Sequence, residues 1–369
     1  MIVKEVESRE AERYYMASQW KLMWRKFKKH KVAIIGLVLL VGYYGVAVFC
    51  EFLAPYDIYT RNVDYVYCPP QRVHFFDDQG FPLRPFVYDL QQEFDLKKFE
   101  RTYTEDKSRK YRIALFVRGD RYRLWGLWET DLHLFGVKDG VLYLLGSDEL
   151  GRDMLSRVLY ATRISLSVGV VGVILSFILG CVIGGVAGYY GGVADTIVQR
   201  VTEFLISIPD IPFWLGLSAA VPSDWSAVKV YFTITVILSL SSWTGLARIV
   251  RGQLLELREE DFVMAARISG AGDRQIMGRH LMPSVLSQLI IRLTLSIPWM
   301  ILAETSLSFL GLGLRPPVVS WGVLLKNAQN IQDVALHPWL LVPGLFVVVA
   351  VLAFNFLGDG LRDAADPYR

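Results

Sequence analysis

Long apolar runs separated by polar segments dominate the chain and predict helices that span a membrane. A helix needs about 20 mostly apolar residues to cross the hydrocarbon core of a bilayer. Six runs meet this need, and their approximate bounds are 32–53, 164–189, 201–220, 230–249, 286–310 and 339–357. The third run contains Pro209 and Pro212 together with Glu203 and Asp210, so we expect a kinked helix there. The pattern predicts an all-α polytopic membrane protein with six transmembrane helices.

Basic residues beside the apolar runs predict how the chain is oriented. Short cytoplasmic flanks of membrane helices are enriched in lysine and arginine, whereas long segments cross largely regardless of charge. One basic group precedes the first run and comprises Lys21, Arg25, Lys26, Lys28, Lys29 and Lys31. A second follows the fourth run and comprises Arg251, Arg258, Arg267, Arg274 and Arg279. We therefore expect residues 1–31, the loop 248–284 and the C-terminus in the cytoplasm, with 32–55 as the first transmembrane helix.

Residues 56–144 are expected outside the cytoplasm, as an insertion between the first two membrane helices, and 145–369 then form a five-helix core. The stretches 111–117 and 140–145 resemble strands, and Arg118-Gly-Asp-Arg121 between them is typical of a turn. Disordered segments are poor in aromatic residues. This segment contains several, among them Phe116, Trp125, Trp128 and Phe135. A small folded insertion, α/β or β-rich, is therefore favoured over a disordered tether.

Composition narrows the function classes. The 369 residues are 53% hydrophobic, with a mean hydropathy of +0.34, whereas soluble domains are about 45–50% apolar. A net charge of +3 gives no indication of a nucleic-acid partner. The histidines and cysteines have no metal-ligand spacing, and hydrolase motifs are absent, so we expect neither a metal site nor catalytic residues. No Gly-x-x-x-x-Gly-Lys-Ser/Thr phosphate loop occurs, so this chain is not expected to bind ATP.

The charged stretch 261–283, hereafter the docking segment, has the pattern of two short helices. Acidic residues at 259–261 favour a helix start, and Gly270-Ala271-Gly272 favours its end. Asp273 is expected to cap a second helix, and Pro283 to mark the start of the next membrane span. Small side chains and arginines suit a groove on a partner protein, but they suit an amphipathic helix on the membrane surface equally well.

The docking segment resembles the coupling loop of ATP-binding-cassette importer permeases, which carries the Glu-Ala-Ala motif. In that motif, Ala-Ala is followed by three residues and a Gly, and a Pro stands thirteen residues further on. Ala265-Ala266, Gly270 and Pro283 match this spacing. The chain departs from the motif at Met264, which stands where Glu is usual, and at His280. These departures are similar to the looser pattern of the oligopeptide/dipeptide permease branch.

Three further stretches resemble the same branch. Residues 145–157 resemble its signature before the second span, 307–322 its fifth-span exit, and 355–367 its C-terminus. Together with the first span they place the chain in the second of the two permease subunit types. The first of these stretches, hereafter the elbow, carries Asp148, Gly151, Arg152, Asp153 and Arg157. It is either a contact near a binding protein or, as we favour, a structural turn at the outer membrane face whose charges pair among themselves.

The resemblance implies a partner for each step of transport. A second, homologous permease subunit completes a heterodimeric path, and two ATP-binding subunits hold ATP and Mg, so that this chain binds no cofactor itself. An extracytoplasmic solute-binding protein delivers the solute across the inner membrane of a prokaryote. ATP closes the two ATPase subunits, which moves the docking segment and switches the path from inward-open to outward-open. The residues implied in this coupling are Ala265, Ala266, Arg267, Gly270, Ala271, Arg279, His280 and Pro283.

The insertion leaves the solute open, since caps of this length occur in branches that carry peptides and in branches that carry oligosaccharides. Two polar residues lie within membrane runs, Glu304 in the fifth and Asn355 near the inner end of the sixth. Such groups are costly in a bilayer and either line a path or tie helices together, and tying is favoured for Glu304. Rival functions are an ATP-independent transporter or channel, a membrane scaffold and an intramembrane hydrolase.

Overall fold

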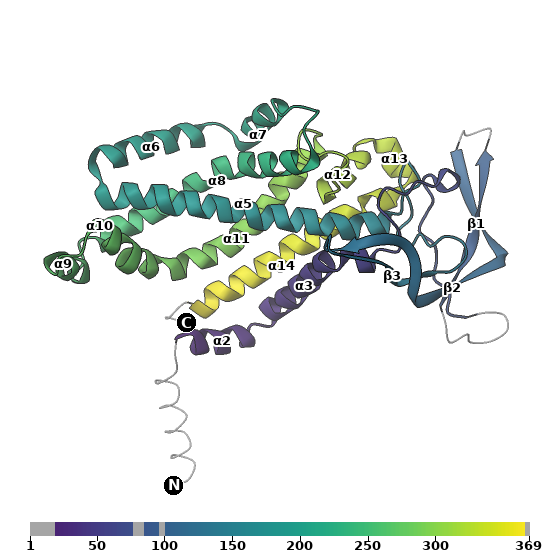
Figure 1. Cartoon of the computed structure of the whole chain (residues 1–369), viewed down its shortest axis with the longest axis horizontal. Coiled ribbons are helices and arrows are strands. Elements are labelled where there is room, and N and C mark those ends of the chain that lie inside the picture. The colour runs from purple at the N-terminus through teal and green to yellow at the C-terminus, as the bar shows by residue number, and fades with distance from the viewer. Residues whose placement is uncertain (1–18, 77–84, 96–99, 366–369) are drawn as a thin grey trace, which may run out of the picture.

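The computed structural model describes residues 19–76, 85–95 and 100–365, and most of them are helical (Figure 1). The long helices are α3 (Lys31–Val48), α5 (Met154–Tyr190), α8 (Ala227–Leu257), α11 (Met282–Phe309) and α14 (Val342–Ala365). The shorter helices are α2 (Gln19–Lys29), α4 (Cys50–Leu53), α6 (Gly192–Ser207), α7 (Asp210–Ala219), α9 (Asp261–Ile268), α10 (Asp273–Gln275), α12 (Trp321–Lys326) and α13 (Ile331–Leu336). Single turns are η1 (Val63–Tyr65), η2 (Ile276–Leu281), η3 (Asn327–Gln329) and η4 (Pro338–Leu341).

Within the described residues, five helical stretches are long and apolar enough to cross a membrane. They are Lys31–Val48, Met154–Tyr190, Ala227–Leu257, Leu289–Phe309 and Pro338–Ala365. The predicted run 201–220 is instead divided between α6 and α7, neither of which has the length of a span. Proline disfavours the helical conformation of the residue before it, and Ile208, which precedes Pro209, is extended at φ −90° and ψ 124°. The expected kink is therefore a complete break.

Small residues allow α5 and α8 to pack closely along most of their length. A Cβ atom on Gly184 of α5 would lie 2.4 Å from the carbonyl oxygen of Ala247 on α8, so only glycine permits this approach. Ser239 of α8 donates a 3.0 Å hydrogen bond to the carbonyl of Gly172 on α5. Small interfacial residues and hydroxyl hydrogen bonds of this kind are the usual means of helix association within a bilayer.

Helix α5 begins well before the predicted run at 164, because its first turns carry paired charges. Asp153 caps the helix by accepting a hydrogen bond from the Ser156 backbone N–H at 2.8 Å. Arg163 forms two 2.5 Å hydrogen bonds to the carboxylate of Glu51, which follows the first span in α4. This bidentate pair joins the outer end of the first membrane helix to α5.

A three-stranded antiparallel sheet occupies the residues between α4 and α5. Its strands are β1 (Phe86–Asp95), β2 (Glu100–Leu124) and β3 (Trp128–Val137), in the order β1-β2-β3. The first half of β2 pairs with β1, from Phe86 opposite Arg112 to Asp95 opposite Glu100. The second half pairs with β3, from Ile113 opposite Val137 to Leu124 opposite Trp128.

The turn predicted at Arg118–Arg121 is wrong, because these residues lie within β2. They form an irregularity in which the register shifts between Arg118 and Tyr122. The hairpin turn lies instead at Trp125 and Gly126, which have φ values of 53° and 73°. The stretch 140–145, predicted as a strand, has no strand structure. The stretch 111–117, also predicted as a strand, lies in β2.

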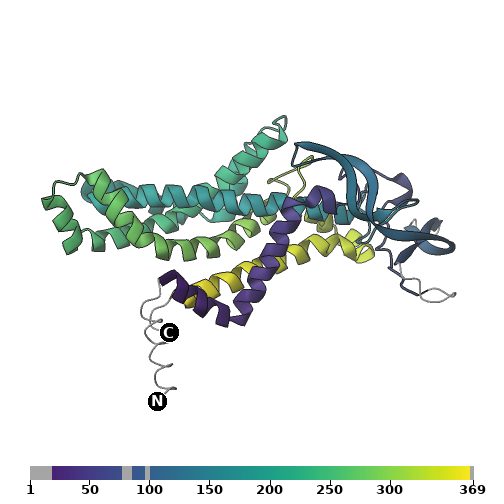
Figure 2. The ribbon, with the colours of Figure 1, turned by 60° about the horizontal axis from the view of Figure 1, so that its bottom comes forward.

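Figures 1 and 2 both place the sheet at one end of the helix bundle and α9 and α10 at the opposite end. Helix α2 and the last turns of α14 lie toward the same end as α9. Phe27 of α2, Ala33 of α3 and Ala364 of α14 form a small buried cluster there. The two basic regions of the chain are therefore on one side of the bundle, and the sheet is on the other.

Candidate functional site

The docking segment is anchored to the bundle by one apolar face. Val263 of α9 and Ile276 and Leu281 of η2 are fully buried. They pack in a cluster with Val250 and Leu254, from the last turns of α8. The same cluster includes residues of α5 and α11, so the segment contacts three membrane helices at once. The docking segment is therefore packed against the ends of those helices.

The opposite face of α9 is exposed and apolar. Ile268 is 86% exposed, and Phe262 and Met264 are also exposed. Ala265 and Arg267 lie on the exposed side, whereas Ala266 is half-buried. The sequence interpretation did not single out Ile268, although helical periodicity places it off the buried face that Val263 defines. An isoleucine in this position is suited to insertion into an apolar groove on a partner.

Gly270 ends α9 in a Schellman motif. Its backbone is left-handed, with φ +84°. The N–H of Ala271 donates to the carbonyl of Ala266, and the N–H of Gly270 donates to that of Arg267, both at 3.0 Å. This is the six-to-one and five-to-two pattern that satisfies the last helical carbonyls. The glycine break expected from the sequence is thus a defined turn that sets the direction of the chain after Ile268.

Tyr189, at the end of α5, holds the two halves of the docking segment. Its hydroxyl donates a 2.7 Å hydrogen bond to the carboxylate of Asp273, and the Arg267 guanidinium lies 5.8 Å from its ring centroid. Asp273 therefore does not cap the second helix as predicted, and Gly272 occupies the cap position. The Arg267 guanidinium thus contacts Tyr189 on α5 of the same chain, although Arg267 was expected to contact a partner protein.

Pro283 does not begin a separate helix. The chain is helical from Asp273 into α11 through η2, a π-helical turn in which the N–H of Met282 bonds to the carbonyl of Met277. Pro283 has no N–H to donate to the carbonyl four residues earlier, and its ring crowds that carbonyl. The helix widens to a π-helical turn because of these two effects. Within and beside this turn, Arg279 and Pro283 are exposed and His280 is half-buried.

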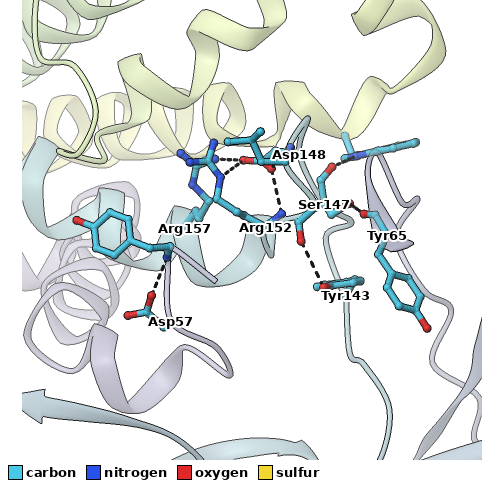
Figure 3. Close-up of polar contacts among 11 residues, drawn as sticks. Asp57, Tyr65, Tyr143, Ser147, Asp148, Arg152 and Arg157 are labelled. Atoms are coloured by element: carbon cyan, nitrogen blue, oxygen red, sulfur yellow. Dashed lines mark hydrogen bonds and ion pairs between the residues drawn. The ribbon is translucent and has the colours of Figure 1, made fainter. Parts of the chain in front are cut away.

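The elbow is built around a buried carboxylate (Figure 3). Asp148 is fully buried and bonds to Arg152 Nε at 2.8 Å and to Arg157 Nη1. Its second oxygen accepts the backbone N–H groups of Leu150 and Arg152 at 2.9 and 3.0 Å. Two arginines and two backbone donors therefore converge on one carboxylate, which fixes the turn that leads into α5.

The remaining elbow residues have structural partners. Asp153 bonds to the backbone and hydroxyl of Ser156 rather than to either arginine. Burial raises the pKa of the Asp153 carboxyl to about 6, and its Oδ1 atom has no hydrogen-bond partner among the described residues. Gly151 has φ +69° and lies against the backbone of Asn62. The elbow thus joins the start of α5 to the segment that follows the first span.

Glu304 is fully buried within α11 and accepts hydrogen bonds from three serines. The distances are 2.7 Å from Ser308 on α11, 2.7 Å from Ser320 at the cap of α12, and 3.3 Å from Ser165 on α5. Three elements therefore meet at one carboxyl group. Asn355 lies half-buried on α14 and is not part of this network.

The bundle therefore combines long apolar helices with an anchored segment whose exposed face is apolar, an architecture that suits a membrane permease. Two family models match the chain. The "binding-protein-dependent transport system inner membrane component" model matches residues 179–368, and the "N-terminal TM domain of oligopeptide transport permease C" model matches residues 18–70. The sheet and the elbow lie between the two matched parts.

Curated relatives resemble much of the chain. The dipeptide transport system permease protein DppC of Bacillus subtilis is 31% identical over 345 residues, which are 93% of this chain and 84% of the relative. A putative peptide permease protein of Brucella ovis is 43% identical over 67% of this chain and 81% of the relative. The oligopeptide transport system permease protein OppC of Haemophilus influenzae is 41% identical over 61% of this chain and 70% of the relative.

The chain belongs to the family of binding-protein-dependent transport system inner membrane components, in its oligopeptide/dipeptide permease branch. It is accordingly a permease subunit of an ABC importer and a multi-pass membrane protein. Its role in the importer is that of a transport component rather than an enzyme.

Proposed function

We propose that this chain forms one half of the translocation path of an ATP-driven peptide importer and couples to ATPase subunits through the docking segment. The observation that carries the proposal is the two-sided structure of α9, with Val263 fully buried and Ile268 86% exposed. A segment that is rigidly anchored and apolar on its outer face transmits the movement of a partner. An amphipathic membrane-surface helix needs no such junction with three spanning helices.

The remaining parts of the importer follow from this role. A second permease subunit completes the path, two ATP-binding subunits bind ATP and Mg, and a solute-binding protein delivers the solute. Six crossings, with α6 and α7 together serving as the third, place both termini and the docking segment in the cytoplasm. The position of α2 and α9 at one end of the bundle and of the sheet at the other supports this orientation (Figure 1). Peptides are proposed as the solute because the curated relatives are named for peptide or dipeptide transport.

The docking role is tested by association with the ATPase subunits. Ile268→Asp places a charge on a side chain that is already in solvent, so the fold is expected to be unaffected while the ATPase pair no longer co-purifies with the permease. Ile331→Asp is the matched control, because Ile331 is 84% exposed on α13, at the end of the bundle that carries the sheet. Equal recovery of the ATPase with both variants would contradict the docking role. ATP-independent uptake by the complex would favour the rival transporter.

A further inference from the structure

The break between α6 and α7 opens into a cavity of about 490 Å³. Helices α5, α8 and α11 supply its other walls, and the cavity size is within the usual range of ligand pockets, about 300–1,000 Å³. Its hydroxyl and carboxyl side chains are those of Ser176, Asp210, Ser241, Ser242, Thr244 and Ser296, and the indole of Trp299 also lines it. Ser242 is near the middle of α8, so the cavity is at the depth of the bilayer core rather than at either surface.

Asp210 is the charged group of this cavity. It is the first residue of α7, and it is exposed. The ion pairs found among the described residues do not include Asp210, and no lysine, arginine or histidine belongs to the described lining. An ionisable side chain at membrane depth is costly and is typical of a solute or ion pathway. A carboxylate in a lining without a cationic side chain is available to a solute that brings its own positive charge.

The hydroxyl groups that line the same cavity also favour a ligand that donates hydrogen bonds. Four of the five already donate their proton to a backbone carbonyl: Ser176 to Ser239, Ser242 to Leu238, Thr244 to Ser241, and Ser296 to Arg292. The fifth, Ser241, accepts from Trp214 Nε1 at 2.9 Å. A hydroxyl whose proton is engaged offers only its lone pairs to a ligand. The described lining thus offers more acceptors than donors, and its side-chain donors are the Ser241 hydroxyl and the Trp299 indole N–H.

We propose that Asp210 and these hydroxyl oxygens receive the α-ammonium group of the peptide as it crosses the membrane. The inference rests on the proposed function and adds a subsite to it. An ammonium group carries three N–H donors and a positive charge, which is the complement of a cavity lined by one carboxylate and by acceptor oxygens. A neutral oligosaccharide, whose hydroxyls both donate and accept, has no need of the charge.

The test uses the complete importer in liposomes, with one peptide offered in two forms, with a free and with an acetylated amino terminus. The measured quantity is the ratio of their ATP-driven uptake rates at saturating binding protein. Because every variant uses the same binding protein, its own preference cancels when variants are compared. Asp210→Asn should lower the ratio by about fivefold or more, as expected for loss of one charge-assisted hydrogen bond.

Two variants serve as controls. Asp210→Glu keeps the charge and should preserve most of the preference. Glu203→Gln removes a carboxylate from α6 that is exposed and paired with Arg200, so the ratio should not change. Uptake of the acetylated peptide reports that each complex is assembled.

An unchanged ratio in Asp210→Asn, or an equal loss of both uptake rates, would overturn the ammonium subsite while leaving the proposed function intact. If the native complex shows no ATP-driven uptake of either peptide, the proposed function is wrong, and the subsite with it.

Discussion

Replacing Gly270 with alanine should weaken coupling without unfolding the protein. Gly270 has φ +84°, and a left-handed backbone costs an L-residue about 1–2 kcal/mol. No atom lies within 4 Å of the position that a Cβ would occupy, so steric contact adds nothing to this cost. The whole penalty therefore falls on the backbone conformation that ends α9.

The penalty is large compared with the interactions that hold the last turn of α9. Val263 anchors the start of the helix, whereas Ile268 at its end is 86% exposed and has little to keep it in place. Unwinding the last turn relieves the strain and breaks the Schellman hydrogen bonds of Gly270 and Ala271. A free energy of about 1–2 kcal/mol corresponds to a factor of about 5–30 in the ratio of intact to unwound segment. Affinity for the ATPase subunits, which scales with the fraction of intact segment, should fall by up to this factor.

The assay compares ATPase affinity and the number of peptides transported per ATP in the purified importer. Gly272→Ala is the matched control, because Gly272 has an ordinary φ of −77° and equally open surroundings. Gly270→Asn should be intermediate, since asparagine tolerates the left-handed region better than alanine does. If Gly270→Ala and Gly272→Ala have the same affinity and the same transport per ATP, the strain argument is refuted.

Three further predictions concern buried carboxyl groups. Asp148→Asn leaves Arg157, which is 3% exposed, without its charged partner and should cost about 3–5 kcal/mol of stability in detergent melting experiments. Glu304→Leu should destabilise more than Glu304→Gln, by about 1–3 kcal/mol for each serine hydroxyl left without an acceptor. Asp153→Asn should gain thermal stability relative to the native chain as the pH is raised from about 4 to about 7.

The sign of the last prediction follows from the raised pKa of Asp153. Burial favours the protonated carboxyl in the folded state, so its contribution to stability is present at low pH and is lost as the pH rises through about 6. Asparagine caps a helix as well as aspartate and does not ionise. A constant difference in melting temperature between the two proteins across this range would contradict the prediction. Glu149→Gln is the control for the two elbow variants, Asp148→Asn and Asp153→Asn, because Glu149 is exposed next to Asp148.

Most of the membrane helices could be predicted from hydropathy because a bilayer imposes a minimum length of apolar sequence on each span. The run 201–220 shows the limit of that rule. Its apolar content is sufficient, yet the backbone of Ile208 is extended and the helix breaks. Whether neighbouring helices satisfy the freed backbone groups of a proline, and so keep a kinked helix whole, is decided by packing.

The bounds of the docking segment could be predicted from the sequence, but the face of α9 that is exposed could not. Spacing identified Gly270 as the end of a helix, and the structure adds the Schellman hydrogen bonds. Which side of α9 is buried depends on Val250 and Leu254 from α8, and that contact left Ile268 exposed. The pairing of Asp273 with Tyr189 joins residues far apart in the chain and overrode the expected helix cap.

The class of protein could be predicted from local properties of the chain, namely the lengths of the apolar runs, the placement of the basic flanks and the spacing of the docking segment. The partners of the buried charges could not, because they come from distant parts of the chain. Arg163 meets Glu51, and Glu304 meets Ser165, across separations of 112 and 139 residues. A charged residue within an apolar run costs free energy in the bilayer, and an ion-pair or hydrogen-bond partner must offset that cost. The identity of that partner depends on which helices pack together. In the same way, the cavity that contains Asp210 forms only where α5, α6, α7, α8 and α11 come together.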